Sequence, residues 1–280
     1  MRSIMWRAVK QSKRRFSVGG SYPSVDALET AKFEADAERW WDTRGGPFAA
    51  LHAMNPARCG FIRDALCRAF NRDPSVPQPL EGLRLLDVGC GGGLLVEPLA
   101  RLGAEVLGCD AVGRSIAVAQ AHARRDPVVH RQVVYRAVPA EQLVTEGVKR
   151  FDGVLSLEVI EHTADAASFV RTLAALRAPG GVLVLSTLNR SLRAYAVAIL
   201  AAEKLLQLVP PGTHDWARFL TPEELALIVS EADAGLYLER VAGIVPQPLS
   251  RTGWVLSPDT SVNYIASWTE PRVSLKNTLA

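Results

Sequence analysis

The amino-acid sequence predicts an α/β protein with a Rossmann-like, doubly wound and mostly parallel sheet of seven strands. After residue 78, short apolar runs alternate with helical segments, which is typical of a parallel sheet with helical crossovers. A glycine-rich turn follows the first of these runs, as at the cofactor-binding end of such a sheet. With 280 residues and 48% hydrophobic composition, the chain is long enough for one large core.

The first 25 residues form a basic segment that contains no acid. It holds six Lys or Arg residues together with serines and apolar residues. An Arg- and Ser-rich composition without acids is typical of a mitochondrial transit peptide, and a cytosolic basic arm is the alternative. Because these six charges outweigh the net charge of +3, the rest of the chain is mildly acidic. That balance argues against a nucleic-acid-binding protein, which needs a basic face.

The cysteines and the apolar stretches exclude two further classes of protein. No Cys-x-x-Cys pair occurs, so neither a disulfide framework nor a zinc site is predicted. The longest apolar stretch, AYAVAILAA, is about half as long as a membrane-spanning helix. We expect four buried thiols in a reducing compartment: Cys59, Cys67, Cys90 and Cys109.

Residues 26–78 are predicted to form an N-terminal helical cap. Apolar residues recur at helical spacing over residues 26–42. Asn55 and Pro56 then predict the N-cap and the first position of a second helix. Three prolines within residues 71–82 indicate the linker that ends the cap.

The predicted main domain covers residues 79–270, and residues 271–280 form a tail. Thr221 begins a capping box that opens a late helix ending at Ala232. Residues 191–212 form a predicted helical insert after the fifth strand. The runs predicted as strands are LRLLDV, AEVLGCD, QVVYRA, FDGVLSL, GVLVLSTL, GLYLERVAGIV and VNYIASW.

The glycine-rich turn is the strongest local signal for a ligand. The first strand ends at Val88, the turn follows from Gly89, and the next strand ends at Asp110, where an acid can bind ribose hydroxyls. A dinucleotide fingerprint would need glycine at position 94, where this chain has Leu94. The pattern therefore favours S-adenosylmethionine, which has no pyrophosphate, and hydride transfer with a dinucleotide is the alternative.

The segment LLDVGCGGG resembles the first motif of class I S-adenosylmethionine-dependent methyltransferases. The segments AKFEADAERWWD, LHAMNPAR, STLNR, VPPGTHDWARFL and VNYIASW together are similar to the ubiquinone-biosynthesis O-methyltransferases, over roughly residues 29–268. The resemblance implies methyl transfer to a phenolic hydroxyl of polyprenylated catechol-type ubiquinone precursors. It also implies peripheral association with the matrix face of the mitochondrial inner membrane and a ubiquinone-biosynthesis protein complex.

The resemblance implies cofactor contacts at Arg58, Gly89, Asp110 and Leu157. Arg58 lies in the first turn of the predicted second helix, where its guanidinium can meet the methionine carboxylate of the cofactor; a solvated surface arginine is the alternative. Leu157 ends the fourth strand, on the edge of the sheet that carries ligands in this fold.

The stretch LSLEVIEHT places three candidate catalytic residues directly after the fourth strand: Glu158, Glu161 and His162. If the segment turns helically, all three share one face. Two carboxylates and an imidazole suit Mg²⁺, Mn²⁺ or Zn²⁺, and a cation at both catechol oxygens would lower the pKa of the phenol. In the alternative, no metal is bound and His162 acts as a general base.

Three alternatives concern larger units of the chain. The insert at residues 191–212 packs on the core or forms an interfacial helix that docks on a membrane. A methyltransferase-like scaffold that binds a lipid or a partner without turnover would be no enzyme. An N- or C-methyltransferase of the same fold would act on another acceptor.

Overall fold

The computed structural model describes residues 24–196, 215–247 and 253–271. Nearly all of the expected transit peptide and tail, and most of the expected insert at residues 191–212, lie outside the described residues.

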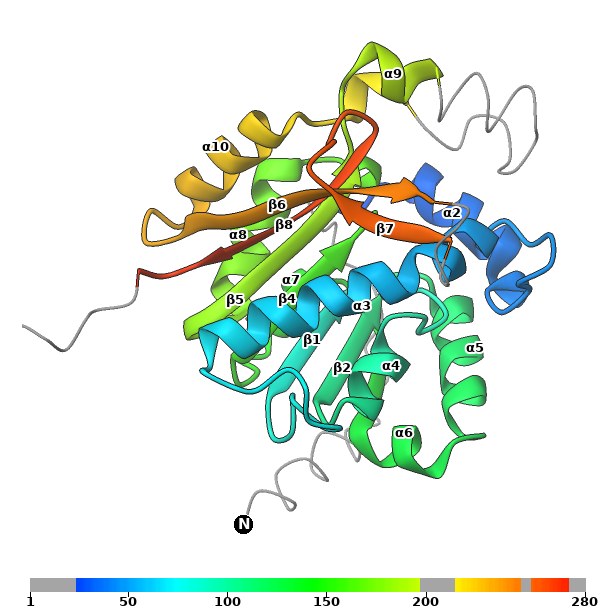
Figure 1. The fold of residues 1–280 in the computed structure, drawn as a ribbon. Coiled ribbons are helices and arrows are strands. Elements are labelled where there is room, and N and C mark those ends of the chain that lie inside the picture. Colours follow the sequence, from blue (N-terminus) through cyan, green and yellow to red (C-terminus); the bar gives the residue numbers. More distant parts are fainter. Residues whose placement is uncertain (1–23, 197–214, 248–252, 272–280) are drawn as a thin grey trace, which may run out of the picture.

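The centre of the molecule is a sheet with the strand order β3-β2-β1-β4-β5-β8-β6-β7 (Figure 1). Its strands are β1 (Arg84–Val88), β2 (Glu105–Asp110), β3 (Val133–Ala137), β4 (Phe151–Leu157), β5 (Arg177–Leu188), β6 (Tyr237–Pro246), β7 (Trp254–Ser257) and β8 (Asn263–Thr269). The first five strands pair in parallel, and β8 pairs antiparallel to both β5 and β6. The mostly parallel α/β sheet predicted from the sequence is confirmed.

The sheet has eight strands rather than the predicted seven. The additional strand is β7, which pairs antiparallel with β6 at the edge of the sheet, with Gly243 opposite Ser257 and Pro246 opposite Trp254. It is only four residues long and half-buried along its length. Such a short run carries too little periodicity to stand out as a strand in the sequence.

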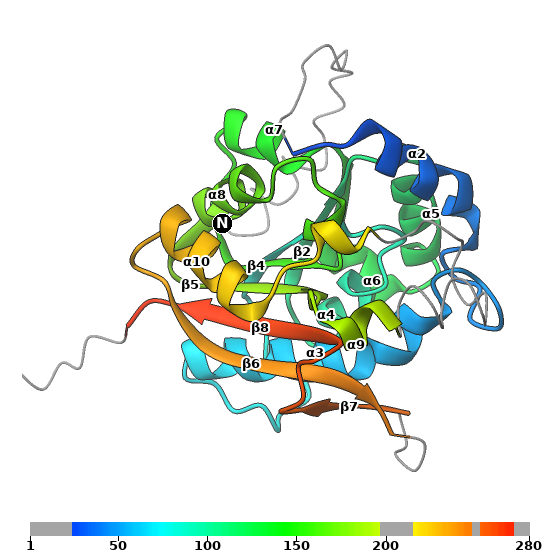
Figure 2. The same ribbon diagram turned by 90° about the horizontal axis from the view of Figure 1, so that it is seen from above.

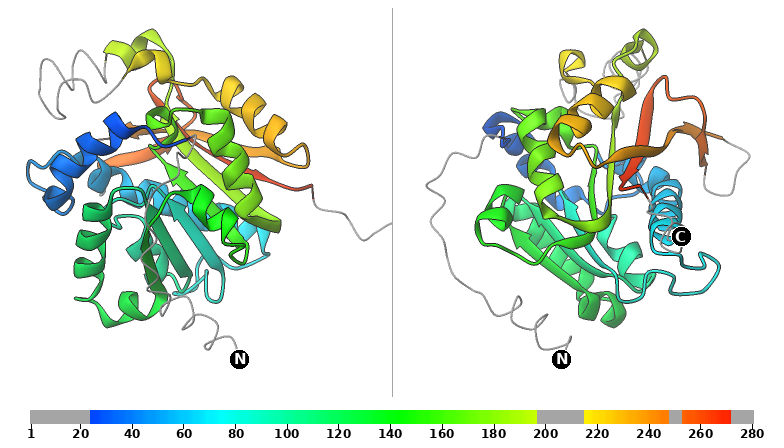
Figure 3. Two further views of the ribbon diagram at one scale, coloured as in Figure 1. Left: turned by 180° about the vertical axis from the view of Figure 1, so that it is seen from behind. Right: turned by 90° about the vertical axis from the view of Figure 1, so that its left-hand side faces the viewer.

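Helices cover both faces of the sheet (Figures 2 and 3). One face packs against α3 (Ala49–Ala69), α4 (Val96–Arg101), α5 (Gly113–Ala123) and α6 (Pro127–Gln132). The other face packs against α7 (Ala140–Thr145), α8 (Ala166–Leu176) and α10 (Pro222–Ala232). Neighbouring strand residues point to opposite faces, so Leu85 belongs to the first apolar core and Leu86 to the second.

The described chain begins with α2 (Ala27–Asp36) and the short 3₁₀ helix η1 (Ala37–Arg39). Asp26 caps α2 by accepting hydrogen bonds from the backbone N–H groups of Leu28 and Glu29. Three further short helices are η2 (Ile160–His162), α9 (Leu192–Ala194) and η4 (Trp216–Arg218). The predicted capping box at Thr221 is present at the start of α10.

The second helix begins earlier than the sequence suggested. Helix α3 starts at Ala49 and contains Pro56 in its interior, so the predicted N-cap at Asn55 is wrong. Instead, Asn55 donates a side-chain hydrogen bond of 2.7 Å to the carbonyl oxygen of Leu94. Burial of one side of α3 against the sheet, with Phe61 fully buried, compensates for the backbone hydrogen bond that a proline cannot donate.

Trp40 fastens the N-terminal segment to the glycine-rich turn. Its ring stacks on Phe48 with centroids 3.6 Å apart, and its indole N–H donates to the Ser115 hydroxyl at 2.9 Å. A Cβ atom on Gly91 would lie 2.2 Å from the Trp40 ring, and one on Gly92 would lie 2.4 Å from Trp40 Cβ. These glycines are therefore needed for packing of the N-terminal segment.

We expect Trp40→Ala to lower the free energy of unfolding by about 3–5 kcal/mol, the usual cost of deleting a large buried aromatic side chain. Urea denaturation followed by circular dichroism measures this change. The matched control is Leu28→Ala on α2, where the side chain is 78% exposed and little change is expected. Equal stability of the two variants would contradict the anchoring role of Trp40.

Candidate active site

A cavity lies at the carboxyl ends of β1, β2 and β4, beside α2. It is lined by six of the residues singled out in the sequence: Arg58, Gly89, Asp110, Leu157, Glu158 and His162. Glu161 does not line it and is buried, with 4% of its surface exposed. Helix α2 adds lining residues that the sequence analysis did not select, among them Glu29 and Phe33.

Asp110 holds the glycine-rich turn in place. Its carboxylate accepts hydrogen bonds from the backbone N–H of Gly91 at 2.9 Å and of Val112 at 2.8 Å. The turn is therefore tied to the end of the neighbouring strand. Each carboxylate oxygen can accept more than one hydrogen bond, so Asp110 can still bind the hydroxyls of a ribose.

Gly89 lets the chain just after β1 approach the chain just after β4 at the cavity wall. Its φ of +74° lies in the left-handed region that favours glycine. A Cβ atom there would lie 2.4 Å from Cγ2 of Val159. Leu157, at the end of β4, also lines the cavity.

Arg58 is a buried cation with unused hydrogen-bonding capacity. Its Nη2 lies 3.0 Å from Glu158 Oε1. Neither Nε nor Nη2 of Arg58 makes a hydrogen bond of good geometry within the described part of the chain. A guanidinium in this state suits a carboxylate ligand, which can accept two parallel hydrogen bonds.

Asp87 is a buried acid for which the sequence analysis gave no role. Burial and the nearby charge of Asp110 raise the pKa of Asp87 to about 8, against the opposing effect of Arg58. The sequence did offer a signal for Asp87, because it is the acid of β1 and stands two residues before the glycine-rich turn. A strongly raised pKa in a cavity is typical of a functional site.

Glu158 adopts a backbone conformation that is unusual for a residue with a side chain. Its φ is +56°. The Ser186 carbonyl oxygen accepts a hydrogen bond from the Glu158 N–H at 3.0 Å, and the Ser186 hydroxyl donates to Glu158 Oε1 at 2.8 Å. Strained residues of this kind concentrate at active sites, and β5 holds this one in place.

The carboxyl group of Glu161 is buried in surroundings that disfavour its charged form. Within the described residues its Oε2 has no hydrogen-bond partner. Burial and the nearby charge of Glu158 raise the pKa of Glu161. The two carboxylates thus lie close enough to repel each other.

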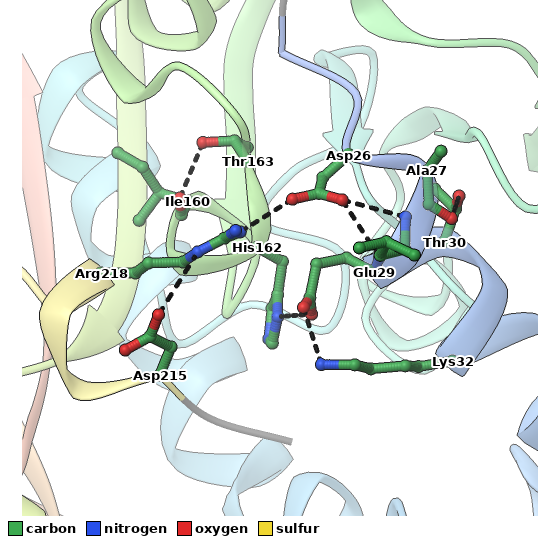
Figure 4. Close-up of polar contacts among 11 residues, drawn as sticks. Asp26, Ala27, Glu29, Thr30, Lys32, Ile160, His162, Thr163, Asp215 and Arg218 are labelled. Atoms are coloured by element: carbon green, nitrogen blue, oxygen red, sulfur yellow. Dashed lines mark hydrogen bonds and ion pairs between the residues drawn. The ribbon is translucent and has the colours of Figure 1, made fainter. Parts of the chain in front are cut away.

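His162 contacts a residue far away in the sequence. Its Nδ1 lies 2.8 Å from Oε2 of Glu29 on α2, across a separation of 133 residues (Figure 4). Burial raises the pKa of Glu29, but hydrogen bonds and charges from Lys32 and His162 outweigh it, and the pKa lies below its usual value. No local motif connects Glu29 with His162, so the sequence analysis missed this pair.

The expectation that the three candidate metal ligands share one helical face is wrong. Glu158 precedes the 3₁₀ helix η2 in a left-handed conformation and faces Arg58, whereas His162 faces Glu29. Among the residues that the structure describes, no three His, Cys, Asp or Glu side chains are gathered closely enough to hold a metal ion. The predicted divalent cation is therefore not supported by this arrangement.

The comparisons with known proteins agree on a methyltransferase. A family profile described as "Methyltransferase domain" matches residues 54–240. The chain is 50% identical to the mitochondrial ubiquinone biosynthesis O-methyltransferase of Arabidopsis thaliana, over 89% of this chain and 76% of that protein. It is 49% identical to the ubiquinone biosynthesis O-methyltransferase of Methylobacterium sp. (strain 4-46), over 89% of this chain and 97% of that protein.

A solved structure supports the fold at lower sequence similarity. Magnesium protoporphyrin IX methyltransferase from Synechocystis PCC 6803, with bound S-adenosylmethionine, aligns with a TM-score of 0.56 and 18% identity. The alignment covers 90% of this chain and all of that one.

We expect Asp110→Ala to weaken S-adenosylmethionine binding by about 1.5–3 kcal/mol, because hydrogen bonds to charged groups are the strong ones. Isothermal titration calorimetry measures the affinity. Because Asp110 also holds the turn, Asp110→Asn serves as a second variant that keeps an acceptor oxygen. Unchanged affinity in a folded Asp110→Ala variant would refute the assignment of this residue to the cofactor site.

Asp87 should make the stability of the ligand-free protein depend on pH. An aspartate in an unfolded chain loses its proton near pH 4, whereas Asp87 keeps it up to about pH 8 in the folded protein. Between these values the folded state binds more protons, so the free energy of unfolding falls as the pH rises, by up to about 1.4 kcal/mol per pH unit.

Asp87→Asn should remove this part of the pH dependence, as measured by urea denaturation between about pH 4 and pH 8. The exposed acid Glu231 on α10 supplies the control variant Glu231→Gln, which should follow the unmodified protein. A slope that is the same in all three proteins would contradict the raised pKa of Asp87.

Proposed function

We propose that this chain, which belongs to the ubiquinone biosynthesis O-methyltransferase family, methylates a phenolic hydroxyl of a polyprenylated, catechol-type precursor of ubiquinone. S-adenosylmethionine supplies the methyl group. The observation that carries the proposal is a single cavity that is lined both by Gly89 and Asp110 and by His162. Such a cavity can hold a cofactor and an acceptor next to each other.

The residues around the cavity fit S-adenosylmethionine. The buried Arg58 guanidinium would bind the carboxylate of the methionine portion, because its Nε and Nη2 have no well-formed hydrogen bond among the described residues. Asp110 would bind the ribose hydroxyls. Gly89 and Leu157 would let the cofactor lie against the ends of β1 and β4.

His162 would act on the acceptor. A phenol with a pKa near 10 is about one part in a thousand ionised at pH 7, so forming the phenolate costs roughly 4 kcal/mol. In the proposed step, the phenolic proton moves to the imidazole and the phenolic oxygen forms a bond to the methyl carbon. The bond between that carbon and sulfur breaks, and S-adenosylhomocysteine leaves with the electron pair. General-base catalysis of this kind contributes about 10²–10⁴-fold in rate.

A divalent cation is a second, separate proposal. One observation favours it: Glu161 Oε2 is buried without a hydrogen-bond partner in the described structure, next to the like charge of Glu158. Together with His162, these carboxylates are donors that Mg²⁺, Mn²⁺ or Zn²⁺ accepts. A cofactor carboxylate on Arg58 would compete with Glu158 for the guanidinium, and Glu158 would then remain bonded to the Ser186 hydroxyl. A bound cation would lower the pKa of the phenol.

Two alternative functions make different demands on the cavity. A scaffold that only binds a lipid or a partner needs no general base in the cofactor cavity. Detectable methylation of a catechol would therefore exclude the scaffold. An N- or C-methyltransferase would methylate an amine or a carbon acceptor and leave catechols unmodified.

We also propose that the chain works in mitochondria, at the matrix face of the inner membrane and within a ubiquinone-biosynthesis protein complex. The mitochondrial relative from Arabidopsis thaliana and the composition of residues 1–25 support the compartment. Peripheral contact with the membrane is supported by the exposed side chains of Leu192, Tyr195 and Trp216. None of the described helices has the length and apolar character needed to cross a bilayer.

We expect His162→Ala to lower the rate of catechol methylation by about 10²–10⁴-fold. The affinity for S-adenosylmethionine should persist, because that ligand relies on other residues. The matched control is His130→Ala, since His130 is exposed on α6 and does not line the cavity. Full activity of the His162→Ala variant would refute the proposed role of His162.

A chelator tests the cation in the same assay. If Glu158, Glu161 and His162 hold a divalent cation, chelation should abolish turnover and added Mg²⁺, Mn²⁺ or Zn²⁺ should restore it. Turnover at the full rate by the metal-stripped enzyme would overturn the cation proposal and leave His162 as the base.

A further inference from the structure

Helix α2 supplies a carboxylate to the proposed catalytic histidine. Oε2 of Glu29 lies 2.8 Å from Nδ1 of His162, and the side chain of each residue is only 13% exposed (Figure 4). Both side chains line the cavity beside the cofactor turn. A hydrogen bond shielded in this way persists better than one at the open surface.

A second residue of α2 fixes the plane of the same ring. Phe33, one turn after Glu29, meets the His162 ring edge-on, with the ring centroids 5.0 Å apart and an angle of 88° between the planes. Residues four apart lie on one face of a helix. One helical face therefore sets both the hydrogen bond and the orientation of the imidazole.

The start of α2 is itself held on two sides. Asp26 caps the helix and also accepts a hydrogen bond of 3.0 Å from Arg218 of η4. The carbonyl oxygen of Ser24 accepts one of 3.1 Å from the N–H of Ala164, two residues after His162. The Glu29 carboxylate is thus placed before any ligand arrives.

We infer that Glu29 is a positioning residue for His162, which rests on the proposed function of this site. Glu29 accepts a hydrogen bond from Nδ1–H of His162 and so fixes the neutral tautomer in which Nδ1 keeps its proton and Nε2 carries the lone pair. The nitrogen that remains protonated in a neutral histidine is set by the hydrogen bond it makes. The same tautomer serves both proposals for the site, because Nε2 then accepts a phenolic proton or coordinates a cation.

Three variants separate this role from simple attachment of α2. Glu29→Ala removes the acceptor, whereas Glu29→Gln keeps a neutral acceptor oxygen. Glu34→Gln is the matched control, because Glu34 is an exposed acid of the same helix. Arg218→Ala loosens the start of α2 without removing a contact of His162.

The first measurement is the tautomer of His162 in the cofactor-free, metal-free protein. Nitrogen-15 chemical shifts of the imidazole report it, and the spectrum of a His162→Gln variant assigns the signals. Glu29→Ala should shift the ring toward a mixture of tautomers. Glu29→Gln and Glu34→Gln should retain the single tautomer of the unmodified protein.

The second measurement is the split between kcat and KM for a catechol acceptor. Glu29→Ala should lower kcat by about 10–100-fold, as for other partners that orient a functional histidine, with little change in KM or cofactor affinity. Glu29→Gln should recover part of kcat. An unchanged tautomer in Glu29→Ala would overturn the inference, and so would equal losses of kcat in Glu29→Ala, Glu29→Gln and Arg218→Ala.

The proposed function and the proposed role of Glu29 can fail separately. If the unmodified protein methylates no catechol, the proposed function fails, but the tautomer measurement still tests the role of Glu29. If the protein does methylate catechols and the tautomer is insensitive to Glu29, the inference fails alone.

Discussion

The arrangement of the site depends on the excess of buried and half-buried acids near one guanidinium. Asp87, Asp110, Glu158 and Glu161 come from the ends of β1, β2 and β4, and Arg58 of α3 is the cation among them. Charges that leave water are stable only with a partner. Burial first, and then the charge of a neighbouring acid, therefore raise the pKa of Asp87 and of Glu161. A cationic ligand relieves the repulsion. The sulfonium and ammonium groups of S-adenosylmethionine match that requirement, and its carboxylate matches Arg58.

The N-terminal segment completes the cavity that the sheet begins. Trp40 packs where side chains on Gly91 and Gly92 would stand, and Glu29 and Phe33 hold the ring of His162. The glycines of the turn therefore have two roles, since they make room both for a ligand and for the helical segment that covers it. Binding of the cofactor and docking of this segment share one surface, and each can stabilise the other.

The sequence predicted those parts of the fold that depend on local patterns. Apolar runs that alternate with helical segments predicted the parallel strands, and the capping box at Thr221 predicted the start of a helix. Contacts between distant residues were not predictable in this way. Nothing near His162 indicates Glu29, nothing near Glu158 indicates its strained φ or its pairing with Arg58, and the four residues of β7 are too short to show a period. The motif of three ligand-type residues follows β4, and two of its members, Glu158 and His162, line the cavity. The direction of each side chain depended on tertiary contacts.

Glu29 and Phe33 lie on one face of α2, a helix of ten residues, and both contact the ring of His162. Because one short helix carries both side chains, the two contacts form and break together. Alignment of the histidine is therefore all-or-none, since it is complete when α2 is docked and any displacement of α2 would remove it. A change anywhere along this helix would reach the imidazole through the same two contacts.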